Sequence, residues 1–144
     1  MPIAYFDSSA MVKLVVEEAG SDLAAQLWDG CDTAVASRLA YPEVRAALAA
    51  AGRNHDLDPG GQACAEQAWE EFWSATRPVE LTRAVEQNAG QLAARHALRG
   101  ADAVHLASAL ALSDAGLILV AWDRRLRAGA QAAGLRIAPA DPGP

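Results

Sequence analysis

The stretch Leu117-Ile118-Leu119-Val120-Ala121-Trp122-Asp123 holds six consecutive apolar residues and then an acid. A short, continuous apolar run is typical of a strand that is buried on both faces, as in the middle of a parallel sheet. A helix-like segment at 124–133 follows it. The N-terminus has the same order, because the apolar run 2–6 ends at Asp7 and a helix-like segment through Val16 comes next. We therefore expect both strands to lie in one parallel sheet.

The rest of the chain continues this alternation of strands and helices. Strands are predicted at 33–37, 78–81 and 135–137, and helices through 21–28 and at 39–51, 62–75, 83–97 and 102–115. Ser8 or Ser9, and Ser21 or Asp22, are candidate helix N-caps, and Gly52 is a candidate C′ residue.

This pattern predicts an α/β domain over residues 1–138, with three layers (α/β/α) and a central, mostly parallel sheet of about four or five strands. Residues 139–144 are expected to form a frayed C-terminal tail.

Composition and charge exclude several classes of protein. With 52% hydrophobic and 21% charged residues, the chain is typical of a globular protein rather than a disordered one. No apolar run approaches the roughly 18 residues that a membrane span needs, and the N-terminus lacks the pattern of a signal peptide. Cys31 and Cys64 form no CxxC motif, which fits a reducing cytoplasm. The net charge of −6 argues against a broad basic face, but not against an enzyme that approaches phosphate through a metal ion.

Four acids occupy positions where a charge does not help folding. Asp7 and Asp123 each end a predicted buried strand, and Glu43 and Asp102 lie in otherwise apolar, helix-like segments. A buried carboxylate is costly unless it is paired or binds a metal. Because ligands of parallel sheets bind beyond the carboxyl ends of the strands, these acids are predicted to share one crevice. Clustered carboxylates are a hard-oxygen site that suits Mg²⁺ or Mn²⁺.

Each acid also has a purely structural explanation. Asp7, Asp102 and Asp123 stand at predicted helix starts, where an acid stabilises the helix by about 0.3–1 kcal/mol. For Glu43 taken alone, a solvated position on its helix is the favoured interpretation. The spacing by itself leaves both interpretations open.

Four segments in order resemble the PIN-domain ribonucleases, and specifically the VapC-type toxins of bacterial toxin–antitoxin pairs. They are residues 3–10 (IAYFDSSA), 36–44 (ASRLAYPEV), 98–109 (LRGADAVHLASA) and 120–126 (VAWDRRL). The third segment is the most specific of the four. The resemblance covers nearly the whole chain and implies a PIN-like fold. It also implies an Mg²⁺- or Mn²⁺-dependent endoribonuclease that hydrolyses RNA phosphodiester bonds.

The resemblance also implies a role for each acid. Asp7 and Asp102 would be direct metal ligands. Asp123 and Glu43 would complete the metal shell through water molecules and would orient the water that attacks the phosphate. Mg²⁺ keeps several of its waters, so few direct ligands are needed.

The chain departs from its relatives at two places. Ala121 stands where relatives often carry a Ser or Thr, so a hydroxyl near the site is missing. Arg124 and Arg125 follow Asp123, where some relatives have a fifth acid, so a four-acid site is expected.

Several polar residues are candidates for contacts around the acids. The candidate substrate-binding residues are Ser8, Ser9, Arg38 and Arg124, with Arg125 and Arg127 as further guides for an RNA backbone. Helix capping by the serines and solvated charge for the arginines are the alternatives. His105 lies one helical turn after Asp102, and a core or supporting position is favoured over a ligand.

The implied partners are an RNA such as tRNA or another structured RNA, a VapB-type antitoxin, and a second copy of the chain in a homodimer. A cytoplasmic protein without a membrane partner is expected. A haloacid-dehalogenase-like phosphatase is disfavoured because Ser9 stands where it needs a second Asp. A phospho-receiver domain needs an early acid pair and a late lysine, which the sequence lacks. A catalytically inactive PIN-like RNA- or protein-binding module stays open as the alternative.

Overall fold

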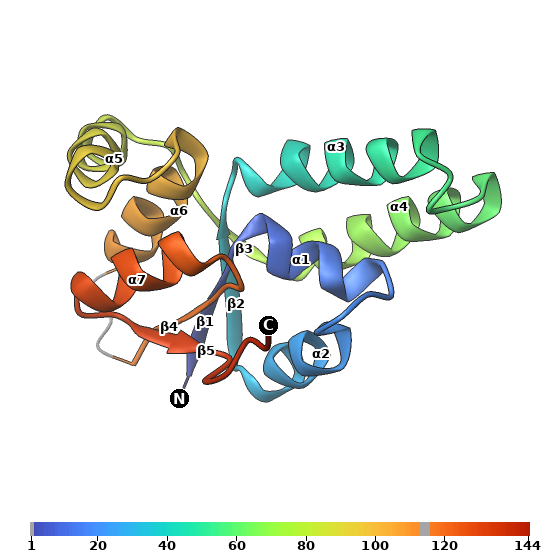
Figure 1. Ribbon diagram of the computed structural model, residues 1–144, viewed down its shortest axis with the longest axis horizontal. Coiled ribbons are helices and arrows are strands. Elements are labelled where there is room, and N and C mark those ends of the chain that lie inside the picture. The colour runs from blue at the N-terminus through green and yellow to red at the C-terminus, as the bar shows by residue number, and fades with distance from the viewer. Residues whose placement is uncertain (1, 113–115) are drawn as a thin grey trace.

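The computed structural model describes residues 2–112 and 116–144 and contains a sheet of five strands in the order β3-β2-β1-β4-β5 (Figure 1). The strands are β1 (Ile3–Phe6), β2 (Thr33–Ser37), β3 (Arg77–Val79), β4 (Ile118–Val120) and β5 (Arg136–Ala138). All four neighbouring pairs are parallel. The predicted parallel α/β sheet is therefore confirmed, with β1 at its centre.

Helices connect the strands and cover the sheet. They are α1 (Ser8–Val15), α2 (Ser21–Gly30), α3 (Ala40–Arg53), α4 (Pro59–Ser74), α5 (Arg83–His96), α6 (Gly100–Leu110) and α7 (Arg124–Ala132). Among the described residues, no helix is long and apolar enough to cross a membrane.

The strand register divides the core into two layers. Tyr5 of β1 is aligned with Val35 of β2 and Leu119 of β4, and these three side chains pack with α5, α6 and α7. The alternate residues Ala4 and Phe6 point to the opposite face and pack with α1 to α4. Figure 1 shows these two groups of helices on either side of the sheet. The three-layer prediction is confirmed.

The ends of two helices near the sheet differ from the sequence prediction. Asp7 caps α1, in place of Ser8 or Ser9, because its extended backbone ends β1 and its carboxylate accepts the Ala10 N–H at 2.8 Å. Gly20, which has no side chain that could accept a hydrogen bond, precedes α2 in place of the predicted caps Ser21 or Asp22.

Gly52 lies inside the last turn of α3 and does not end it, because α3 continues to Arg53. A Cβ atom at Gly52 would lie 2.0 Å from Oε1 of Gln62 on α4. A side chain at Gly52 would therefore displace the flexible end of Gln62, and the glycine does not occupy a left-handed turn.

The helix predicted at 102–115 also has different ends. Gly100 starts α6, since a residue in the first turn needs no N–H partner within the helix. The helix ends at Leu110, and residues 113–115 of the prediction lie outside the described residues.

Arg127 holds the C-terminal end of the sheet and is not available to guide RNA, which corrects the sequence prediction. Its side chain is buried, with Nη1 donating to the Ala121 carbonyl at 2.8 Å and Nη2 to the Pro139 carbonyl at 2.7 Å. The predicted tail, residues 139–144, forms no helix or strand, yet its first residue is buried and tied to α7 by this contact.

We expect Arg127→Met to lower the free energy of unfolding by about 2–4 kcal/mol, because two buried carbonyls are then left without charged donors. Urea unfolding measures this decrease. The matched control Arg125→Met, at an exposed neighbour on the same helix, should stay within about 0.5 kcal/mol of the original protein. Equal decreases in both variants would contradict the structural role of Arg127.

Candidate active site

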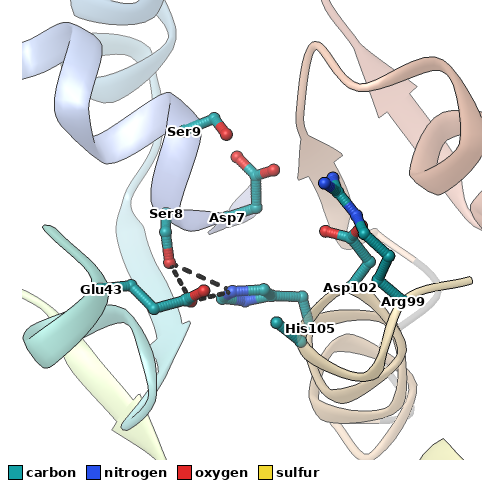
Figure 2. Close-up of a pocket in the computed structure, with 8 residues that line it drawn as sticks. Asp7, Ser8, Ser9, Glu43, Arg99, Asp102 and His105 are labelled. Carbon is teal, nitrogen blue, oxygen red and sulfur yellow. Dashed lines mark hydrogen bonds and ion pairs between the residues drawn. The ribbon is translucent and has the colours of Figure 1, made fainter. Parts of the chain in front are cut away.

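A pocket of about 250 Å³ opens at the carboxyl edge of the sheet, where α1, α3 and α6 begin. Its lining residues are Asp7, Ser8, Ser9, Glu43, Arg99, Ala101, Asp102 and His105 (Figure 2). Three of the four predicted acids therefore share one pocket, at the place where the strand pattern puts the carboxyl ends of β1 and β2.

Each acid is positioned by the start of a helix. Asp7 directly follows β1 and caps α1, Glu43 lies in the first turn of α3, and Asp102 lies in the first turn of α6. Figure 2 shows the carboxylates of Asp7 and Asp102 pointing into the space between α1 and α6.

Asp123 does not line this pocket but the hollow next to it, so a single crevice shared by all four acids stays a prediction. It caps α7, with Oδ2 accepting the Leu126 N–H at 3.4 Å. It lines a neighbouring depression with Arg99, Arg124 and Arg125. Arg99 borders both hollows. Asp123 therefore lies in the hollow next to the other three acids, and the two hollows share Arg99.

A buried hydrogen-bond network fixes Glu43. The Tyr5 hydroxyl accepts the Ser37 N–H at 3.1 Å and lies 2.7 Å from Nδ1 of His105, while Nε2 of His105 lies 2.8 Å from Oε1 of Glu43. When the Tyr5 hydroxyl donates to Nδ1, the imidazole proton is on Nε2 and points at Glu43. Ser8 Oγ donates to the same carboxylate oxygen at 2.5 Å.

This network sets the charge of Glu43. Burial acts to raise the pKa of Glu43, but the hydrogen bonds from His105 and Ser8 outweigh it, so the pKa lies below its ordinary value. Burial also raises the pKa of the Tyr5 hydroxyl, which stays neutral. The network therefore presents an ionised, oriented Glu43 to the pocket.

The contacts of His105 agree with the supporting position expected from the sequence. The sequence pattern places Tyr5 in an apolar strand and does not single it out as part of the site. The hydroxyl of Tyr5 is the signal in the sequence that could identify it, because a buried tyrosine hydroxyl needs a hydrogen-bond partner.

The surroundings of Asp7 disfavour its charged form. Burial, with the charges of Asp102 and Glu43, raises its pKa from 3.8 to about 6, against the favourable effects of His105 and the Ala10 N–H. A cation in the pocket would relieve this penalty.

The donor set fits a hydrated divalent ion. In the part of the chain that the structure describes, no three His, Cys, Asp or Glu side chains are grouped closely enough to hold a metal by themselves. Asp7 and Asp102 do offer carboxylate oxygens to one pocket. Mg²⁺ prefers such oxygens and retains several waters, so two protein ligands are compatible with it.

The candidate substrate contacts separate into two groups. Ser8 and Ser9 line the pocket, and Ser8 is engaged with Glu43. Arg124 lines the neighbouring depression. Arg38 lines neither hollow, and its exposed guanidinium pairs with Glu80 at 2.7 Å. Its contact with substrate stays a prediction.

We expect Asp7→Asn to stabilise the metal-free protein at neutral pH. The raised pKa of Asp7 means that its charge destabilises the fold above about pH 6, and that the penalty disappears as the pH falls below 3.8. Asn keeps an oxygen for the Ala10 N–H but carries no charge. The gain should reach about 3 kcal/mol at pH 7.5 and fall below about 1 kcal/mol near pH 4.

Urea unfolding in EDTA at both pH values measures this gain. The control Glu71→Gln removes an exposed acid on α4 and should change stability by less than about 0.5 kcal/mol at either pH. A gain for Asp7→Asn that does not depend on pH would show that relief of a buried charge is the wrong explanation.

Comparisons with known proteins identify the family. The PIN domain family model matches residues 4–131. Ribonuclease VapC45 and Ribonuclease VapC49, from two strains of Mycobacterium tuberculosis, are each 69% identical over 140 residues, which covers 97% of this chain and 97% of each relative.

Solved structures show the same fold. A toxin–antitoxin complex from Klebsiella pneumoniae matches with a TM-score of 0.68 and 18% identity, over 97% of this chain and 98% of that chain. The sarcin–ricin-loop-cleaving toxin VapC20 of M. tuberculosis matches with a TM-score of 0.67 and 20% identity, over 92% and 95%. The chain therefore belongs to the PIN-domain family and, within it, to the VapC-type ribonucleases.

Proposed function

We propose that this chain is a metal-dependent endoribonuclease and the toxin of a VapBC-type toxin–antitoxin pair. The observation that carries the proposal is the pocket in which Asp7, Glu43 and Asp102 meet, in a chain 69% identical to the ribonucleases VapC45 and VapC49. The proposed substrate is RNA, such as tRNA or another structured RNA.

Asp7 and Asp102 are the proposed ligands of Mg²⁺ or Mn²⁺. When bound, the ion supplies neutralisation of phosphate charge and lowers the pKa of a water. Asp102 holds Arg99 beside the pocket, since Nε of Arg99 donates to Oδ2 of Asp102 at 3.1 Å. The remaining N–H groups of this guanidinium are donors for a phosphate oxygen.

Glu43 is proposed to orient the attacking water. Its Oε1 atom is fixed by Ser8 and His105, which leaves the other carboxylate oxygen to accept a hydrogen bond from a water in the pocket. Asp123 acts from the neighbouring depression, where it attracts the Arg99 guanidinium. Ala121 offers no hydroxyl to this site.

The proposed partners follow the relatives. A VapB-type antitoxin is proposed because solved neighbours with this fold include toxin–antitoxin complexes. A homodimer and a cytoplasmic location are proposed from the resemblance to the VapC-type toxins. The described Cys31 and Cys64, both free thiols, are compatible with a reducing compartment.

Cleavage of RNA tests the proposed reaction. The purified chain should cut a pool of structured RNAs with Mg²⁺ or Mn²⁺ and stop cutting in EDTA. Asp102→Asn should lower kcat by about 100-fold or more, because it removes a proposed ligand while keeping the shape of the side chain. Glu71→Gln should cut at the original rate. If the original chain binds RNA but does not cut it with either metal, the inactive-module alternative replaces the nuclease.

Metal binding without RNA gives a separate prediction. Mg²⁺ at about 100 times its Kd should raise the free energy of unfolding by about 2.7 kcal/mol. Asp102→Asn should abolish most of this gain, whereas Glu71→Gln should keep it. Thermal or urea unfolding across an Mg²⁺ titration measures both. An undiminished gain in Asp102→Asn would remove Asp102 from the ligand set.

A further inference from the structure

A basic surface lies beside the acidic pocket, on α7 and β5. We call Arg124, Arg125 and Arg136 the α7–β5 arginines. Arg124 and Arg136 line a hollow of about 580 Å³ together with Gln131, Leu135, Ile137 and the largely buried Arg127, and none of its lining residues in the described part of the chain is acidic. The exposed guanidinium groups therefore have space for a ligand next to them.

Among the described residues these arginines have no ion-pair partner, unlike Arg99, which pairs with Asp102. No ion pair joins any of the three to an acid within the described ranges 2–112 and 116–144. In contrast, Arg38 pairs with Glu80 and Arg45 pairs with Glu70. Between residues 117 and 140 the sequence has four arginines and one acid, although the whole chain has a net charge of −6. Three of these arginines, Arg124, Arg125 and Arg136, are exposed, so this segment is locally basic in an acidic chain.

The surface is continuous with the proposed catalytic pocket. Arg99 lines that pocket and also the depression of about 380 Å³ that holds Asp123, Arg124 and Arg125. Arg124 in turn lines the hollow at Arg136. A chain of hollows, each sharing an arginine with the next, therefore leads from Asp102 to the exposed edge strand β5.

We infer that the α7–β5 arginines bind the phosphates of the RNA strand on one side of the bond to be cut. This inference rests on the proposed nuclease function. A strand whose phosphate lies at the acids must continue away from them, and this route offers unpaired guanidinium groups, which bind phosphate oxygens in a bidentate manner. Leu135, Ile137 and Gln131 add apolar and amide surface for the sugars and bases.

RNA affinity as a function of salt tests this surface. The full-length chain, in EDTA so that the RNA stays intact, is titrated with a fluorescein-labelled single-stranded oligoribonucleotide of mixed sequence. The double variant Arg124→Gln/Arg136→Gln should bind more weakly. The plot of log K against log salt has a negative slope. The magnitude of this slope should decrease by about 0.7 for each phosphate that is no longer neutralised, or by about 1.4 in total. Thermal unfolding should show that the variant is folded, as expected for exposed side chains.

Two matched variants isolate the cause. Arg53→Gln removes an exposed arginine from the last turn of α3, at the far end of the molecule from α7 in Figure 1, and should leave the slope unchanged. Arg124→Lys/Arg136→Lys keeps the charge and should retain most of the slope. If the slope of the lysine variant is as shallow as that of the glutamine variant, charge-based binding of phosphate is overturned.

The outcomes separate this surface from the proposed reaction. If the original chain cuts RNA but the double variant binds it with an unchanged slope, the assignment of the surface is wrong and the nuclease stands. If the original chain binds RNA without cutting it, and the double variant binds more weakly, the nuclease fails and the surface stands. If the original chain binds no RNA, the RNA surface is overturned.

Discussion

The buried carboxylate of Asp7 is the constraint on which the site depends. It lies at the end of the central strand β1 and is only 3% exposed, so its charge is disfavoured by burial and by neighbouring acids. One of its oxygens accepts the Ala10 N–H and thereby starts α1. An apolar residue here would leave the helix uncapped, and an acid leaves a charge that a cation relieves. Helix cap and proposed metal ligand are therefore compatible roles of one side chain, although the sequence presents them as alternatives.

The same strand also organises the second acid. Tyr5 points to the face covered by α5, α6 and α7, where it contacts His105 of α6. His105 then holds Glu43, which belongs to α3 on the other face of the sheet. Side chains from both helical layers thus meet beyond the end of β1, and the orientation of Glu43 depends on packing in the core. An error of strand register would invert the direction of Tyr5 and break this connection.

The charges of the site are divided between neighbouring hollows. Acids dominate the pocket at Asp7, arginines dominate the surface of α7 and β5, and Arg99 lies at their border. The overall charge of −6 hides this division, because net charge is a sum while a phosphate responds to the charges near it. Arg127 has the same chemistry as its neighbours on α7 but points inward, where it ties Ala121 and Pro139 together. Position on the helix, rather than residue type, separates a structural arginine from one available to a ligand.

The sequence by itself determined the parallel α/β sheet and the placement of Asp7, Glu43 and Asp102 at its carboxyl edge. Strands that are buried on both faces must be continuous apolar runs, so an acid at the end of such a run marks the rim. Only the tertiary structure decided that Asp123 lines a hollow next to the other acids and that Arg38 pairs with Glu80. It also created the contacts of His105 with Glu43 and Tyr5, which are 62 and 100 residues away along the chain. Periodicity reports which face of an element is buried, but the partner of a polar side chain depends on which distant element packs against it.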